Sequence, residues 1–110
     1  MDESLSDNAY IRYILEQHKE KDFVQRVLSP EKYPSIDLGG GHRGTHLMMW
    51  GNYEGTPIVF PSIVNVGGGL QRKTPAAAFV HAIKTGEFIP FQNGEDADWF
   101  SRNYKMIWQK

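Results

Sequence analysis

The stretch that decides the fold covers residues 45–66 and reads THLMMWGNYEGTPIVFPSIVNV. Residues 45–50 and 57–66 are rich in β-branched, aromatic and methionine side chains, a composition that favours two strands. The link between them, residues 52–55, is short and ends in a glycine that can supply a positive φ. We therefore predict a β-hairpin here as the nucleus of a small antiparallel sheet.

Two prolines in the second strand constrain its place in that sheet. Pro57 and Pro61 each lack the N–H that a ladder hydrogen bond needs. We therefore expect this strand at a sheet edge, or with both proline nitrogens turned outward, or with a bulge near Pro61. The glycines at 67–69 predict a second loose turn, after which residues 70–71 return briefly as a strand.

Helical patterns precede the hairpin. The first covers about residues 6–19, where Ser6 and Asp7 can cap the start of an amphipathic helix. Its apolar stripe consists of Tyr10, Ile11, Ile14 and Leu15. The stripe recurs over residues 23–28 and stops before Pro30, because proline disfavours helix in the residue before it. This pattern predicts either two short helices or one bent helix.

Two further helices are expected after the hairpin. Thr74 can cap free amides, Pro75 suits the first helical position, and Gly86 closes this helix. Residues 88–91 predict a short extended piece, and Asn93 opens the last helix with acids in its first turn. The expected inner faces are Ala78, Phe79, Ala82 and Ile83 in one helix, and Ala97, Phe100, Tyr104, Ile107 and Trp108 in the other. The sequence thus predicts an α+β fold in which a sheet built on a central hairpin packs against N-terminal and C-terminal helices.

Composition predicts one soluble domain. The chain has 110 residues, of which 40% are hydrophobic, enough for a single core spanning residues 1–110. Residues 1–21 form an N-terminal helix that could also be an appended arm. With 12 basic and 13 acidic residues the net charge is -1, so we expect no nucleic acid partner. No apolar run approaches the ~20 residues that would span a membrane.

Chemistry based on metals or cysteine has little support. The chain has no cysteine, which excludes disulfides, thiolate metal sites and cysteine nucleophiles. His42 and His46 are four residues apart and would share one face of a helix, but the glycines around them argue against a helix and no third ligand is near. We predict no metal and no cofactor: His42 is a solvated loop residue, and His46 makes a structural hydrogen bond at a strand start.

Glycine-rich stretches offer a weak signal for anion binding. Residues 30–44 hold two prolines and four glycines and are expected to form a loop with a flexible tip at residues 39–41. Amides of this loop, with Arg43, could cradle an anion, but the lysine and hydroxyl of a phosphate loop are absent and a strand follows instead of a helix. A flexible loop is the prediction here. The same holds for residues 67–69, despite the basic residues 72–73 close behind.

A catalytic reading is also weak. The acids of residues 95–98 are explained by capping and the helix dipole. Thr45 and Ser62 are conceivable nucleophiles beside His46, yet neither lies in the strand–turn–helix elbow that exposes a nucleophilic serine. We therefore predict a protein that is not an enzyme and has no catalytic residues.

Aromatic side chains are the remaining candidates for binding. A stacking platform for bases or sugars could be formed by Trp50, Tyr53, Phe60, Trp99 and Trp108. Such a platform needs basic neighbours, and here the neighbours are neutral or acidic, so core packing is the prediction. Trp99 lies off the apolar stripe of the last helix and is expected to be exposed. The predicted partner contacts are Arg43, His46, Trp50, Tyr53 and Trp99.

The order of several short segments resembles a known family. These segments are FVQRVL (23–28), THLM (45–48), IVFPSIV (58–64), TGEFIPF (85–91), EDADWFS (95–101) and NYK (103–105). Over residues 22–108 this order resembles a small module of tailed bacteriophages, found alone or fused within virion-associated, internal or tail-region proteins. Gly44 and Leu47 depart from that module, which commonly has serine and arginine there, and residues 71–73 also depart from it.

The resemblance implies a phage context and brings no established catalysis. It implies a structural or virion-associated accessory protein that is made in the host cytoplasm, resides in the virion and acts through protein–protein contacts. Its partners would be other phage structural proteins or further copies of the chain. Two alternatives remain open: an accessory to a cell-wall-degrading or other hydrolytic phage protein, and a phage factor that binds a host protein.

Overall fold

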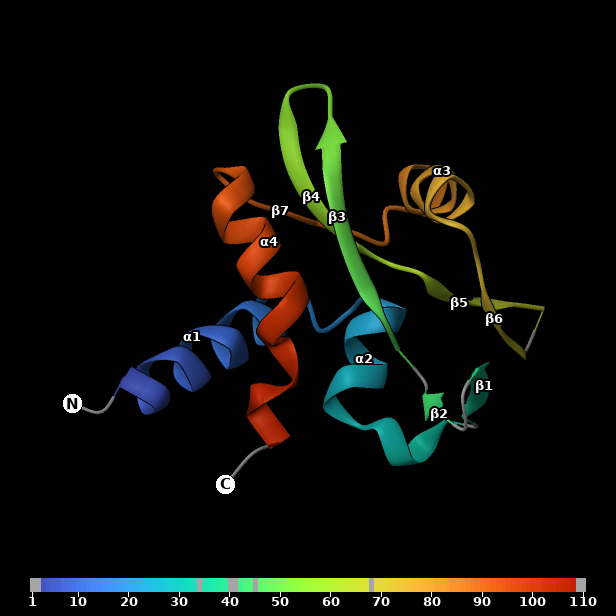
Figure 1. Cartoon of the computed structure of the whole chain (residues 1–110), viewed down its shortest axis with the longest axis horizontal. Helices are drawn as coiled ribbons and strands as arrows, with labels where there is room; N and C mark the ends of the chain where they lie inside the picture. The colour runs from blue at the N-terminus through green and yellow to red at the C-terminus, as the bar shows by residue number, and fades with distance from the viewer. Residues whose placement is uncertain (1–2, 34, 40–41, 45, 68, 109–110) are drawn as a thin grey trace.

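A computed structural model of the chain describes residues 3–33, 35–39, 42–44, 46–67 and 69–108. The α-helices are α1 (Glu3–Gln17), α2 (Asp22–Leu28), α3 (Pro75–Thr85) and α4 (Gly94–Asn103), and the 3-10 helices are η1 (Pro30–Lys32) and η2 (Tyr104–Trp108). The strands are β1 (Ile36–Gly39), β2 (His42–Gly44), β3 (Met48–Tyr53), β4 (Thr56–Pro61), β5 (Ile63–Val66), β6 (Gly69–Arg72) and β7 (Ile89–Pro90). The predicted α+β class is confirmed (Figure 1).

The predicted central hairpin is formed by β3 and β4. The two strands pair antiparallel from Met48 opposite Pro61 to Tyr53 opposite Thr56. Glu54 and Gly55 make the turn with φ of 51° and 83°, so both central residues have the positive φ of a tight hairpin turn whose twist matches that of the strands. β7 pairs with the other side of β4, which gives the sheet order β3-β4-β7.

The expected edge position of the second strand is wrong, because β4 is the central strand of this sheet. The sheet tolerates its prolines because β7 pairs only with Ile58 and Val59. The N–H of Phe91 donates to the Pro57 carbonyl at 2.8 Å, so the Pro57 nitrogen also faces the β7 side, at the end of the short ladder. A bend at Ser62 then ends β4, and the chain continues as β5, which pairs with β6.

Three local predictions also need correction. Most of the expected loop over residues 30–44 is ordered as η1 and an antiparallel β1–β2 hairpin, with residues 40–41 outside the described part. The glycine-rich sequence offers no side-chain signal for this hairpin. Its strands can still pair, because ladder hydrogen bonds need only the backbone. α1 begins at Glu3, so Ser6 and Asp7 lie within the helix and do not cap it. Beyond Asn103 the last helix tightens into η2.

The helices cover the two faces of the sheet separately (Figure 1). Along β4, Val59 packs into a core cluster with residues of α1, α2 and α4, whereas Ile58 and Phe60 pack into a second cluster with α3. This division follows from the alternation of side chains along a strand. Ile11 and Leu15 of α1 are fully buried in the first cluster, so α1 is part of the core and does not project as an arm.

The predicted caps of the two C-terminal helices are confirmed. The Thr74 hydroxyl accepts from the Ala77 N–H at 3.3 Å, and Gly86 ends α3 with a φ of 77°. The Asn93 side chain accepts from the Asp96 N–H at 2.8 Å at the start of α4. None of the helices in the described residues has the length and apolar character that crossing a membrane requires.

Candidate functional site

The predicted aromatic platform is divided between the two faces of the sheet. Trp50 packs against the first core cluster, and its Nε1 donates to Asp98 of α4 at 3.1 Å. Tyr53 and Phe60 belong to the α3 side, where both rings contact Phe79. The expected exposure of Trp99 is only partial, because its side chain is half-buried against the first core cluster. The side chain of Trp108 lies outside the described part. The described aromatics therefore act mainly in packing, as predicted.

His46 makes a buried polar contact. Its side chain is 7% exposed, and its Nδ1 lies 2.8 Å from the hydroxyl of Tyr104. Burial lowers the pKa of His46 to about 4, with Lys105 and Arg26 adding to the effect, so the imidazole is neutral near pH 7. Burial also raises the pKa of the Tyr104 hydroxyl. In this conformation His46 presents little surface to a partner.

The structure describes only some of the other predicted polar residues. The side chains of His42, Arg43 and Thr45 lie outside the described part, so their expected roles stay predictions. Among the described residues, no cluster of three or more histidine or acidic side chains could hold a metal. Asp98 hydrogen-bonds Arg102, which lowers the pKa of that carboxyl.

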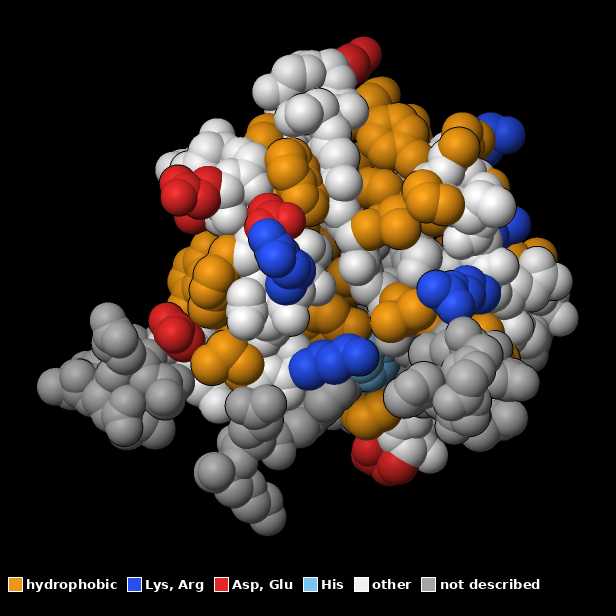
Figure 2. All heavy atoms as spheres, in the orientation of Figure 1, with side chains coloured by type: hydrophobic (Ala, Val, Ile, Leu, Met, Phe, Trp, Pro, Cys, Tyr) orange, Lys and Arg blue, Asp and Glu red, His pale blue; other side chains and the backbone are white. Residues whose placement is uncertain are grey.

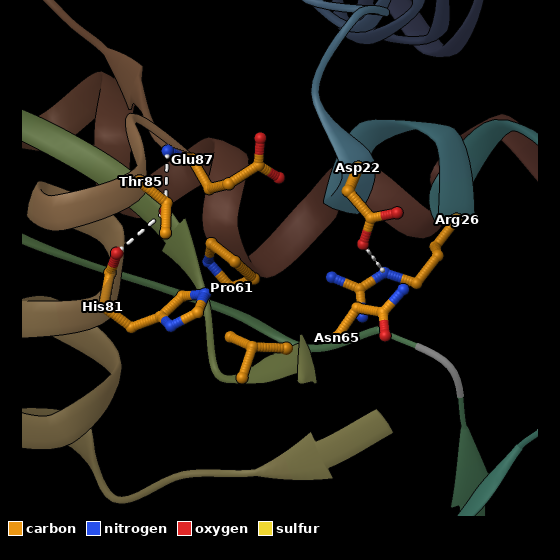
Figure 3. Close-up of a pocket in the computed structure, with 8 residues that line it drawn as sticks. Asp22, Arg26, Pro61, Asn65, His81, Thr85 and Glu87 are labelled. Carbon is orange, nitrogen blue, oxygen red and sulfur yellow. Dashed lines mark hydrogen bonds and ion pairs between the residues drawn. The ribbon is translucent and has the colours of Figure 1, made fainter. Parts of the chain in front are cut away.

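A pocket of about 340 Å³ lies between α2, β5 and the C-terminal end of α3 (Figure 3). Its lining consists of Asp22, Arg26, Pro61, Val64, Asn65, His81, Thr85 and Glu87. Arg26 is 1% exposed, and its Nε lies 3.5 Å from a carboxylate oxygen of Asp22. Within the described residues, Nε and Nη1 of Arg26 have no hydrogen-bond partner. A buried cation with unused donors is uncommon and calls for a physical explanation.

Acidic groups surround this cation. Burial lowers the pKa of Arg26, while the charges of Asp22 and Glu87 oppose that shift. Glu87 also accepts from the N–H of Phe23 at 3.1 Å, and Lys21 donates to the Gly86 carbonyl at 3.0 Å. These contacts fix the start of α2 to the end of α3. Because the unused nitrogens of Arg26 are buried and two carboxylates line the same pocket, we interpret this cluster as structural.

Sequence reasoning missed Arg26 because it lies beside the apolar stripe of α2, where an arginine usually extends into solvent. Glu87 stood within the TGEFIPF segment of the resemblance, but its partner is 64 residues away in sequence. A contact across that separation arises because the fold brings the start of α2 to the segment that follows α3, and it has no local sequence signal.

A groove of about 460 Å³ lies between α1 and the segment from β7 to α4. It is lined by Tyr10, Tyr13, Ile14, Gln17, His18, Ile89, Pro90, Phe91, Gln92 and Asp96. We call it the tyrosine groove, because Tyr13 is 63% and Tyr10 is 41% exposed. The Tyr10 ring lies 5.9 Å from that of Trp99, at an interplanar angle of 54°. Burial and the Asp96 charge raise the pKa of the Tyr10 hydroxyl.

Hydrophobic side chains also gather between the β3–β4 hairpin and α3 (Figure 2). Tyr53, Phe79 and Phe88 are partly buried there against the second core cluster. Their rings pack edge to face, so this surface is largely satisfied within the fold. The tyrosine groove differs in being hollow and in exposing two large aromatic side chains.

Comparison with family models, with curated proteins and with solved structures finds no match to this chain.

Proposed function

We propose that this chain is a virion-associated accessory protein of a tailed bacteriophage and that it acts by binding another protein, without catalysis. The observation that carries the binding role is the tyrosine groove. Tyrosine and tryptophan supply much of the binding energy at protein interfaces, where their rings fill recesses in the partner surface. The phage context rests on the sequence resemblance.

Contacts between segments of the resemblance support treating them as one unit. The FVQRVL and TGEFIPF segments meet where Glu87 accepts from the Phe23 N–H. The IVFPSIV and TGEFIPF segments meet where Val59 pairs with Ile89. Segments that are distant in sequence but joined in one core are what a compact module requires.

The groove favours a partner that inserts apolar side chains. Its lining includes Ile14, Ile89 and Phe91 together with the exposed rings of Tyr10 and Tyr13. Addition of a partner strand to β7 is disfavoured, because Pro90 offers no N–H at that edge. We therefore propose a partner surface that docks by side-chain packing. It belongs to another phage structural protein or to a second copy of the chain.

Site-specific crosslinking in infected cells tests this proposal. The full chain carries photoreactive p-benzoylphenylalanine in place of Tyr13, and particles purified after irradiation are analysed by mass spectrometry. The matched control places the same group at Val80, which is 50% exposed on α3 and lies outside the groove. We expect a crosslink to a virion protein from position 13 and none from position 80.

Other crosslinked species separate the alternatives. A host protein captured from position 13 would favour the host-binding factor, and a phage hydrolase would favour the cell-wall accessory. Absence of the chain from every particle fraction would contradict the virion proposal. Equal crosslinking from positions 13 and 80 would contradict the assignment of the groove.

A further inference from the structure

The strand β3 forms an open edge of the three-stranded sheet. The sheet order is β3-β4-β7, so β4 pairs with one side of β3 and no described strand pairs with its other side (Figure 1). Each residue of β3 is at least partly exposed, whereas β4 is buried from Pro57 to Pro61. The outer side of β3 is therefore accessible along the whole strand.

The register of the β3–β4 hairpin shows which backbone groups face this edge. The two residues that flank the turn form a hydrogen-bonded pair, and such pairs alternate along the ladder with pairs that share no hydrogen bond. Asn52 lies opposite Pro57, whose carbonyl accepts from the β7 side, so these two residues share no hydrogen bond. By the same alternation, the N–H and C=O groups of Met48, Trp50 and Asn52 point away from β4.

This edge lacks the usual protection against strand addition. Edge strands of soluble proteins commonly carry a charged residue, a proline or a bulge that blocks pairing with another chain. The β3 sequence, MMWGNY, has no charged residue and no proline, and it pairs with β4 without a register shift. At the opposite edge of the sheet, Pro90 of β7 offers no N–H. The sheet thus has one edge that disfavours an added strand and one that permits it.

We propose that a second copy of the chain pairs with this edge, with β3 of one copy antiparallel to β3 of the other across a two-fold axis. With the axis at Trp50, the two Trp50 residues lie opposite each other, and Met48 of each copy lies opposite Asn52 of the other. Each of these pairs exchanges both of its N–H···O=C bonds. This register uses all three residues whose backbone groups face outward.

The strand itself favours a second copy as the occupant. Because β3 is uncharged, two copies place no like charges opposite each other. The central residue is a partly exposed tryptophan, and aromatic pairs across neighbouring strands are favourable. Pairing also extends the sheet from three strands to six, at the upper end of the commonest size of about 4–6 strands. Two-fold contacts of this kind are the commonest in soluble oligomers.

This contact is separate from the tyrosine groove. Ile89 and Pro90, which line the groove, belong to β7 at the other edge of the sheet. Self-association through β3 therefore neither requires nor excludes a partner in the groove. It can be tested on the purified chain alone.

Size-exclusion chromatography with light scattering, run on the full chain over a range of concentrations, provides the first test. We expect the mass to rise with concentration to twice that of one chain. Asn52→Pro removes an outward N–H from each copy without removing a bond to β4, so it should raise the dissociation constant about tenfold or more. Asn52→Ala keeps the N–H and is the matched control, which should dimerise like the unchanged chain. Circular dichroism checks that both variants fold.

Cysteine crosslinking tests the register and does not depend on the proline variant. The chain has no cysteine, so Met48→Cys and Asn52→Cys each introduce a single thiol. A mixture of the two variants should form a mixed disulfide on mild oxidation, which mass spectrometry identifies. Each variant alone should crosslink poorly, because like positions are separated by four residues, or roughly 13 Å along the strand, and a disulfide needs Cα atoms within about 7 Å.

Three results would overturn the proposal. A chain that stays monomeric at every concentration would leave the edge to a strand of another protein. Equal dissociation constants for Asn52→Pro and Asn52→Ala would place the contact between copies elsewhere. Crosslinking that is as efficient in each single variant as in the mixture would exclude the antiparallel register.

Discussion

The carboxylate of Glu87 accepts a hydrogen bond from the backbone N–H of Phe23 at 3.1 Å, across 64 residues of sequence. Phe23 is in the first turn of α2, where amides lack partners within the helix, and Lys21 before it has no capping side-chain bond. Glu87 therefore caps α2 from the end of α3. The negative charge of Glu87 also opposes the lowering of the Arg26 pKa that burial causes.

Removal of this distant cap should destabilise the chain. We expect Glu87→Ala to lower the free energy of unfolding by about 1 kcal/mol, the usual cost of losing a helix cap. Glu87→Gln retains an acceptor oxygen and should cost less. Urea unfolding followed by circular dichroism measures both. Glu16→Ala, on the exposed side of α1, is the control and should stay within about 0.5 kcal/mol of the unchanged chain.

Arg26 should be replaceable by an apolar residue of similar length. Arg26→Met removes the buried charge and its unused donors, so we expect an unchanged or higher free energy of unfolding. Asp22→Asn removes the anion and keeps the buried cation, so we expect a loss of about 1 kcal/mol or more. Denaturant unfolding of both variants checks the contrast. A large loss in Arg26→Met would contradict the structural reading of this cluster.

The free energy of unfolding should fall as the pH is lowered from about 6.5 toward 4, because His46 is buried in its neutral form. Its pKa is lowered from 6.5 to about 4 in the folded chain, so the unfolded state binds the proton more readily. The contribution of His46 is complete above pH 6.5 and is lost as the pH falls toward 4, by about 3 kcal/mol at most. Thermal unfolding between pH 4 and pH 7 measures this slope.

Two histidine variants test whether His46 causes this pH dependence of stability. His46→Gln should flatten it, whereas His81→Gln, which changes a half-buried histidine outside the core, should leave most of it intact. An unchanged slope in His46→Gln would show that other groups produce it.

Gly94 should tolerate no side chain. A Cβ at this position would lie 2.7 Å from Cη2 of Trp50, so the ring that packs α4 against β3 would have to move. We expect Gly94→Ala to lower the free energy of unfolding by about 1–3 kcal/mol and to shift the tryptophan fluorescence. Gly69→Ala is the control, because no atom lies within 4 Å of the added Cβ. Equal stability of the two variants would contradict the close packing.

The tertiary contacts explain why the candidate sites escaped sequence reasoning. Tyr10 appeared as part of the buried stripe of α1, yet it is 41% exposed because the groove leaves one side of that stripe uncovered. The sequence predicts β3 only as one strand of the hairpin. Its place at an open edge follows because β7 pairs with β4, a contact between residues distant along the chain.

By itself, the sequence determined the local elements whose signals lie within a few residues. The Thr74 and Asn93 caps, the turn at Gly55 and the stop before Pro30 each depend on short-range backbone chemistry, and the structure has them where the sequence predicted. Only the tertiary structure decided that β4 is central and that Glu87 caps α2. These features join residues distant along the chain, and their positions follow from how the helices cover the two faces of one small sheet.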